Sequence, residues 1–253
     1  MKITFLGTGT SQGVPMILSN HPVNSSKDLK DNRLRSSVLV SWNEFSYLID
    51  CGPDFRQQVL RAEVKNINGI LFTHEHSDHI AGLDDIRPYC YKIGAMPIYA
   101  QKRVMTCLEK RYDYIFQKEN RYPGAAQVEE NIIEDQVFEL NGITITPINL
   151  LHGTLEIFGY RFDNFAYLTD IKYIKEEEKE KLKNLEVLVV SAIRYEPHPT
   201  HFNVEEALAF IEEIKPKKAY ITHISHMLGF HKEVSKALPE NVYLSYDGLE
   251  LEI

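Results

Sequence analysis

Three histidines and one aspartate lie within six residues, at His74, His76, Asp78 and His79. Imidazole and carboxylate groups are the usual protein ligands of zinc, manganese and iron. His74 and His76 are two residues apart, so on an extended segment their side chains point the same way. Asp78 and His79 follow one turn later and can face a second ion. A solvated polar loop with coincidental histidines is the alternative, but four ligand-type residues this close together favour a metal site.

A site for two ions needs more ligands than this segment supplies. Three further candidates each follow an apolar run: His152 comes after residues 148–151, Asp170 after 166–169, and His223 after 220–222. Residues at strand ends lie in the loops that gather around functional sites. Each of them alone would be an ordinary hydrogen-bonding residue. Together with the first cluster, they predict a site that holds two metal ions.

The elements that position these residues follow from apolar periodicity and turn signals. Asn141-Gly142 predicts a tight hairpin, and Asn203 predicts a helix cap. Strands are predicted at Lys2–Leu6, Ser37–Val40, Tyr47–Ile49, Ile70–Phe72, Met96–Ala100, Val137–Leu140, Ile143–Thr146, Ile157–Phe162, Phe165–Leu168, Glu186–Val190, Ala219–Thr222, Tyr243–Ser245 and Glu250–Ile253. Helices are predicted at Asp54–Arg61, Ile80–Ile86, Lys102–Tyr114, Lys172–Leu182 and from Asn203 to Ile214. Hairpins interleaved with helices predict an α/β fold of two packed sheets with helices outside. No repeat or linker divides residues 1–253, so a single domain is expected.

The composition limits the partners that the chain can have. Its 253 residues carry a net charge of −8, which argues against broad binding to nucleic acid or anionic membranes. The three cysteines, Cys51, Cys90 and Cys107, are scattered and indicate neither a disulfide framework nor a cysteine zinc site. The sequence has no leader-like start and no apolar run long enough to cross a bilayer. We therefore expect a cytoplasmic protein with no membrane partner; the oligomeric state stays open, a homodimer included.

The order of these ligand candidates resembles the metallo-β-lactamase superfamily over nearly the whole chain. The shared pattern is H-x-H-x-D-H, then a lone histidine, a lone aspartate after a strand, and a late histidine. The resemblance implies an αββα four-layer sandwich, with mostly antiparallel or mixed sheets and a binuclear site at one edge. It implies that one ion is held by His74, His76 and His152, and the other by Asp78, His79 and His223, with Asp170 bridging. The two divalent ions would be zinc or manganese, with iron also open.

Four stretches resemble the phosphodiesterase branch of that superfamily, which includes phosphoribosyl cyclic phosphodiesterases and, more distantly, tRNA 3′-processing endonucleases. They are Gly7–Pro15, Arg33–Ser37, Pro197–His201 and Thr222–His226. The resemblance implies that His201, just before a helix, acts on the leaving group.

One departure from this branch concerns a structural zinc site. Ser19, His21 and Asn24 stand where relatives often carry zinc-binding cysteines. Without thiolates we expect no structural zinc site. Whether His21 and His226 form a residual site is left open.

These residues together predict a metal-dependent phosphoric diester hydrolase. Two ions stabilise the attacking and leaving oxygens of a phosphoryl displacement and supply the nucleophilic hydroxide. Asp78 would steer that hydroxide, and His201 would serve as the general acid. The expected substrate is a small cyclic or nucleotide-like phosphodiester, with nucleic acid not expected. The alternatives are a hydrolase of the same fold for a lactone, thioester or RNA, and a metal protein like the pyrroloquinoline quinone accessory protein.

Several further residues are candidates for supporting roles. Asp50, at a strand end, is expected to orient a metal-binding histidine through its second ring nitrogen. Arg194, Arg33 and Arg35 are candidates for contacts with phosphate, with ordinary surface arginines as the alternative. His198 either replaces His201 as the proton donor or positions its loop. His231 is expected to be a solvated helix residue.

Overall fold

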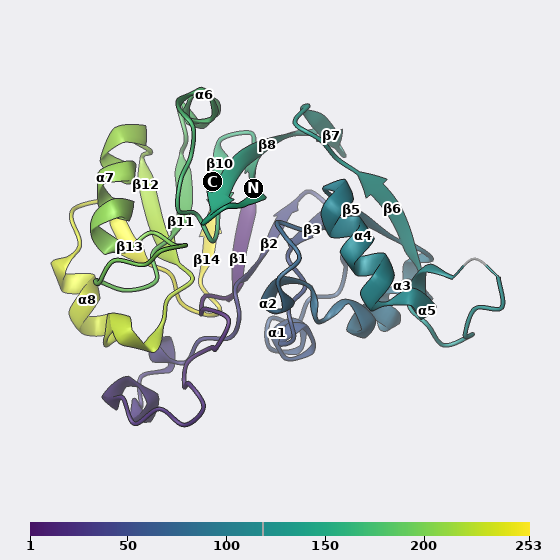
Figure 1. The fold of residues 1–253 in the computed structure, drawn as a ribbon, viewed down its shortest axis with the longest axis horizontal. Coiled ribbons are helices and arrows are strands. Elements are labelled where there is room, and N and C mark those ends of the chain that lie inside the picture. Colours follow the sequence, from purple (N-terminus) through teal and green to yellow (C-terminus); the bar gives the residue numbers. More distant parts are fainter. Residues whose placement is uncertain (118) are drawn as a thin grey trace.

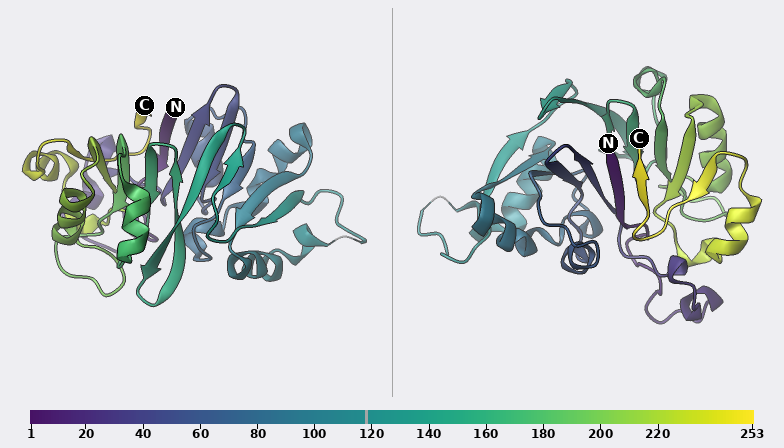
Figure 2. Two further views of the ribbon diagram at one scale, coloured as in Figure 1. Left: turned by 90° about the horizontal axis from the view of Figure 1, so that it is seen from above. Right: turned by 180° about the vertical axis from the view of Figure 1, so that it is seen from behind.

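Two seven-stranded sheets pack face to face in the computed structural model, which describes residues 1–117 and 119–253 (Figure 1). Helices cover the outer face of each sheet, which gives the four-layer αββα arrangement predicted from the sequence. The two termini lie side by side (Figure 2), because the last strand pairs with the first. Both sheets are mixed, and parallel strand pairings are as numerous as antiparallel ones.

The first sheet has the order β14-β1-β2-β3-β4-β5-β6. Its antiparallel part consists of β14 (Glu250–Glu252), β1 (Lys2–Gly7), β2 (Ser37–Trp42) and β3 (Phe45–Ile49). Its parallel part continues from β3 through β4 (Gly69–Leu71), β5 (Met96–Ala100) and β6 (Val128–Ile132). The segment Thr73–His79, called the metal loop below, comes just after β4, so it starts in the interior of this sheet.

The second sheet has the order β13-β12-β11-β10-β9-β8-β7. The antiparallel strands are β7 (Phe138–Leu140), β8 (Ile143–His152), β9 (Leu155–Phe162) and β10 (Phe165–Leu168). The parallel strands that follow are β11 (Val187–Ser191), β12 (Lys218–Thr222) and β13 (Val242–Leu244). The predicted hairpin joins β7 to β8, and its turn residues Asn141 and Gly142 both have positive φ, as a primed turn requires.

Alternating side chains of single strands divide between the layers of the sandwich. In β11, Val187 and Val189 point into the core between the sheets, while Leu188 and Val190 pack beneath the outer helices. That outer layer contains α7 (Val204–Ile214) and α8 (His231–Ala237). On the other side, α1 (Phe55–Arg61), α3 (Arg87–Ile93) and α4 (Lys102–Arg111) cover the first sheet. Burying each large apolar side chain stabilises the fold by roughly 1.5–3 kcal/mol.

Some predicted helices differ from the observed ones. The helix expected over Lys102–Tyr114 breaks at Tyr112, and a separate short helix, α5 (Asp113–Phe116), follows. The charged segment Lys172–Leu182 forms only α6 (Glu176–Lys179) and a 3-10 turn at Glu180–Leu182. The helix expected at Ile80–Ile86 begins earlier, as α2 (Ser77–Ile80), and a 3-10 turn follows at Leu83–Ile86. Neither α3 nor β6 was predicted from the sequence.

The environment of His231 contradicts the prediction that it is solvated. The side chain is only 8% exposed, and its Nδ1 lies 3.2 Å from Nη2 of Arg33. Arg33 is itself buried and donates to Thr8 Oγ1 (2.8 Å) and to the Ser245 carbonyl (2.7 Å). Arg33 therefore connects loops beneath α8 and is not a candidate for binding phosphate at the surface. None of the helices in the described residues has the length and apolar character needed to span a bilayer.

Candidate metal centre

The carboxyl ends of five strands from both sheets supply most of the site. Asp50 follows β3, His74 lies three residues beyond β4, His152 ends β8, Asp170 follows β10, and His223 follows β12. Asp50, Asp170 and His223 have φ angles of 63°, 56° and 56°, a left-handed conformation that is uncommon for residues other than glycine. Non-glycine residues in this conformation concentrate at functional sites, where the surrounding structure holds them. Here they turn side chains from both sheets toward one another.

The metal loop itself ends in the short helix α2, which carries Asp78 and His79. This helix lies against the loop after β3: the Cys51 amide donates to the His79 carbonyl at 2.8 Å. A methyl group at Gly52 would lie 2.0 Å from the Asp78 carbonyl oxygen, so glycine is required for this approach. The backbone contact fixes Asp78 and His79 opposite the strand ends of the second sheet.

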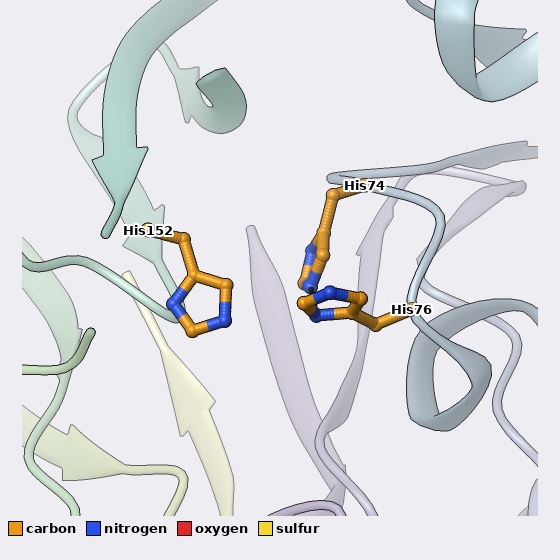
Figure 3. A group of neighbouring side chains, drawn as sticks. All are labelled: His74, His76 and His152. Carbon is orange, nitrogen blue, oxygen red and sulfur yellow. Dashed lines mark hydrogen bonds between the residues drawn. The ribbon is translucent and has the colours of Figure 1, made fainter. Parts of the chain in front are cut away.

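The first group of converging side chains consists of His74, His76 and His152, whose ligand nitrogens lie within 4.8 Å of one another. His74 and His76 come from the metal loop, and His152 reaches them from β8 in the other sheet (Figure 3). His74 Nε2 lies 3.0 Å from His76 Nδ1, so these two nitrogens point at a common position. These are the three residues that the family resemblance assigns to the first ion.

The second group consists of Asp78, His79 and His223. His79 Nε2 lies 3.1 Å from Asp78 Oδ2, and His223 Nε2 lies 3.7 Å from the same oxygen. Asp170 completes the arrangement, since its Oδ2 is 3.3 Å from His79 Nε2 and its Oδ1 is 3.4 Å from His223 Nε2. Asp170 also forms a ligand group with His74 and His79, so its carboxylate lies between the two sets.

The donor atoms of these residues fit divalent metal ions. His79 Nε2 and both ring nitrogens of His223 are buried and lack a hydrogen-bond partner within the described part of the chain. Buried polar atoms without a partner are rare in folded proteins and call for an explanation. A zinc, manganese or iron ion bound among these imidazole nitrogens and carboxylate oxygens would give them a partner.

The electrostatics of the site favour ionised carboxylates. Burial opposes ionisation of Asp78 and Asp170, but the nearby histidines outweigh it, so both carboxyl pKa values are lowered. Burial likewise opposes protonation of His79, yet the carboxylates of Asp78, Asp50 and Asp170 raise its pKa well above the usual range. Burial lowers the pKa of His74 well below its ordinary value. Metal ligands must be deprotonated, and the carboxylates already are.

Three groups contact the Nδ1 atoms of candidate metal-binding histidines and so orient their rings. Asp50 Oδ2 lies 2.7 Å from His79 Nδ1, which is the orienting contact that the sequence predicted for Asp50. Thr73 Oγ1 lies 2.9 Å from His74 Nδ1, and the Thr200 carbonyl accepts from His152 Nδ1 at 2.7 Å. Sequence reasoning did not predict these two threonines. The available signal for Thr73 is its place directly before His74, whereas no signal in the sequence points to the Thr200 carbonyl.

The candidate proton donor His201 lies beside the metal residues. Its ring packs between those of His152 (4.4 Å between centroids) and His223 (5.1 Å). Its Nδ1 is 3.6 Å from Asp170 Oδ1 and, within the described residues, has no hydrogen-bond partner. Burial lowers the pKa of His201 to about 3, although Asp170 opposes the shift.

Two of the remaining candidates, His198 and Arg194, lie in the segment that precedes His201. The ring of His198 lies 4.9 Å from that of His201, and its Nδ1 accepts from the Thr200 amide at 3.3 Å. Arg194 donates to the carbonyls of Glu196 and Pro197, so it holds the loop that precedes His201. His226 lies outside the ligand groups and packs against His21, with 5.4 Å between centroids. Arg35 pairs with Asp54 and does not join the site.

Comparisons with known proteins agree with this geometry. A model of the beta-lactamase superfamily domain matches residues 46–224. A protein from Porphyromonas gingivalis (strain ATCC BAA-308 / W83) named octanoyltransferase is 38% identical over 253 residues, which are 99% of this chain and 51% of that protein. Ribonuclease Z of Bacillus subtilis (strain 168) is 31% identical over 167 residues, 64% of this chain and 48% of the enzyme. The chain thus spans about half the length of these curated relatives.

Two solved structures also resemble this chain. A diphosphatase from the PhnP family superposes with a TM-score of 0.93 at 41% identity, covering 100% of this chain and 97% of that one. Zn²⁺-bound PqqB from Methylobacterium extorquens has a TM-score of 0.82 over the full length of both chains, and at 18% identity it shows a shared fold alone. The chain belongs to the metallo-β-lactamase superfamily.

Proposed function

We propose that the chain is a phosphodiesterase that hydrolyses small cyclic or nucleotide-like phosphodiesters with two divalent metal ions. The observation that carries this proposal is the position of His201, 3.6 Å from Asp170 and stacked on His223. The leaving group of a phosphodiester is an alkoxide, and its departure is helped by a hydrogen-bond or proton donor. A lactone or thioester has a different geometry around its reacting carbon, and a thiolate leaves without such help.

The proposed division of the metal residues is the one that the family resemblance implies. His74, His76 and His152 would hold one ion, Asp78, His79 and His223 the other, and Asp170 would contact both. Zinc and manganese suit this donor set, and iron is also compatible with it. When bound, such a pair of ions supplies Lewis-acid activation of the phosphoryl group and lowers the pKa of water.

His201 would act on the leaving oxygen. Because burial lowers its pKa to about 3, the ring is neutral at pH 7 and offers one N–H donor. To act as a general acid the ring would first take up a proton from solvent as the substrate binds. The negative charges of the bound phosphodiester and of Asp170 favour that protonated ring, which would then give the proton to the leaving oxygen and return to its neutral form. Asp170, on the other side of the ring, stabilises a positive charge there. His198 and Arg194 would position the loop that carries His201.

The relatives support cleavage of phosphate esters or anhydrides. One similar structure is called a diphosphatase, and several curated relatives are called ribonuclease Z. A large RNA substrate fits this chain less well, since its net charge of −8 repels a polyanion. The relative named octanoyltransferase is about twice as long as its match. We assign acyl transfer to the half of that protein which this chain does not match.

Hydrolysis of an acyl thioester is the second candidate. The observation that favours it is that a segment 38% identical to this chain occupies half of a protein named octanoyltransferase, and two activities joined in one protein can act on related acyl compounds. The same ions that activate a phosphoryl oxygen can polarise a carbonyl.

The decisive experiment combines metal analysis with a substrate panel. The purified chain would be loaded with Zn²⁺ or Mn²⁺ and assayed with bis-p-nitrophenyl phosphate, 2′,3′-cyclic nucleotides, an octanoyl thioester and a lactone. Metal-dependent turnover of the phosphodiesters supports the proposal. Turnover of the thioester or lactone alone overturns it. Iron-bound protein that reacts with oxygen and hydrolyses none of these compounds would indicate the cofactor-biosynthesis alternative.

A further inference from the structure

The first and last residues lie together at the end of the sandwich that is opposite the candidate metal centre. β1 and β3 run in the same direction, since each pairs antiparallel with β2. Asp50 follows the carboxyl end of β3, whereas Met1 precedes the amino end of β1. The amide of Ile253 donates to the Met1 carbonyl at 2.9 Å, so the two residues are neighbours (Figure 2). The length of β1, six residues or roughly 20 Å, therefore separates them from the metal end.

An apolar hollow of about 580 Å³ lies beside these two residues. Met1, Trp42 and Ile253 form its apolar wall. Trp42 is 8% exposed and stacks on Tyr47, with 5.2 Å between ring centroids. Met1 and Ile253 are partly buried and pack against the core between the two sheets. The core thus reaches the surface here, in a hollow that can take a bulky side chain of a partner, as the anchoring pockets of protein interfaces do.

The relative from Porphyromonas gingivalis indicates what covers this surface. Its match of 253 residues takes in 99% of this chain and 51% of that protein. Because the match is no longer than this chain, the other half of the relative is not inserted within it and continues from an end of it. Both ends of this fold lie together, so that half starts beside the hollow whichever end it continues from. Two domains joined in this way meet at a high effective concentration and can share an interface.

We propose that the surface around the hollow, which includes Met1, Ser41, Trp42 and Ile253, binds an octanoyltransferase domain. The partner is of this kind because acyl transfer is assigned to the half of the relative that this chain does not match. An apolar side chain of the partner fills the hollow. Since this surface is opposite the metal residues, a bound domain leaves the metal centre uncovered. The inference goes beyond the proposed phosphodiesterase activity and does not depend on it.

Calorimetry tests the proposal by titrating the purified chain with the octanoyltransferase encoded in the same genome. We expect a one-to-one complex. Ile253→Asp places a charge in the hollow and Ser41→Tyr fills it, so each should weaken binding by about tenfold or more. Leu60→Asp is the matched control, because Leu60 is 60% exposed beside a different hollow, on α1. This variant should bind as tightly as the unchanged chain. Circular dichroism would establish that each variant is folded.

Three results would overturn the inference. The first is the absence of a complex with the octanoyltransferase. The second is a complex that Leu60→Asp weakens while Ile253→Asp and Ser41→Tyr do not, because the partner then binds elsewhere. The third is self-association of this chain that Ile253→Asp abolishes, without binding of the octanoyltransferase, which would make a second copy the occupant.

Hydrolysis of bis-p-nitrophenyl phosphate separates this inference from the proposed function. The three variants keep every metal residue, so each should hydrolyse this substrate at the rate of the unchanged chain. If the unchanged chain does not hydrolyse it or any other phosphodiester, the proposed function fails, while the binding result stands on its own.

Discussion

Asp50 fixes the orientation of His79 across the edge of the first sheet: its Oδ2 lies 2.7 Å from His79 Nδ1. The carboxylate also accepts from the backbone amide of Thr73 at 2.8 Å and from the Thr73 hydroxyl. Because Nδ1 is occupied in this way, His79 directs Nε2 at Asp78 and Asp170. A fully buried residue outside the ligand groups thus decides which nitrogen of His79 faces the candidate metal centre.

Replacing Asp50 by Asn should weaken metal binding without removing a ligand. Asparagine can still accept from the Thr73 amide, but it holds His79 Nδ1 less well, because it carries no negative charge. Loss of such an orienting carboxylate typically lowers metal affinity by about 10–100-fold. Competition with a chelator of known affinity would measure this change. Asp54→Asn, which removes a carboxylate that pairs with Arg35 away from the site, is the control and should bind metal normally. Unchanged affinity in Asp50→Asn would contradict the orienting role.

Removal of a proposed ligand should abolish metal and activity together. His76→Ala removes a nitrogen from the first group, and Asp170→Ala removes the carboxylate shared by both. We expect both variants to lose bound metal on gel filtration, as measured by plasma mass spectrometry, and to lose phosphodiesterase activity in parallel. Circular dichroism would establish that they remain folded. A folded Asp170→Ala protein with its full metal content would exclude Asp170 as a ligand.

Replacing His201 by Ala should keep the metal and slow the reaction. A general acid contributes roughly 10²–10⁴-fold, and most when the leaving group is a strong base. We therefore expect a large loss of kcat on a 2′,3′-cyclic nucleotide and a smaller one on bis-p-nitrophenyl phosphate, whose leaving group needs little protonation. Metal content serves as the control. Equal losses on both substrates would mean that His201 positions the substrate and does not protonate the leaving oxygen.

The sequence predicted the ligand groups because their residue types and spacing are themselves the signal. His74, His76, Asp78 and His79 are close together, and His152, Asp170 and His223 each follow an apolar strand that can be recognised without coordinates. Strand periodicity likewise predicted the two packed sheets, since buried strands need apolar side chains whatever their partners are.

Other features of the site depend on contacts between distant segments. The left-handed backbone at Asp170 and His223 has no sequence signature, because glycine is absent there. The orienting atom behind His152 is a backbone carbonyl at Thr200, which residue type cannot reveal. His231 resembles a solvated helix residue in sequence, and only the fold brings it against Arg33, 198 positions away. Helix ends were also missed where local propensity competes with packing, as at Tyr112.

The burial of His231 should make folding stability depend on pH. Burial, followed by the charge of Arg33, lowers the pKa of His231 to about 4 from an ordinary 6.5. Between these values the unfolded chain binds more protons than the folded one, so stability is present above pH 6.5 and is lost as pH falls toward 4. In His231→Asn, the amide oxygen can still accept from Arg33 but does not titrate. Urea unfolding at pH 7 and pH 4.5 should show the unchanged chain losing roughly 2 kcal/mol more than His231→Asn. Carboxylates that titrate in both proteins cancel in this difference, so equal losses would show that His231 becomes protonated in the folded chain without cost.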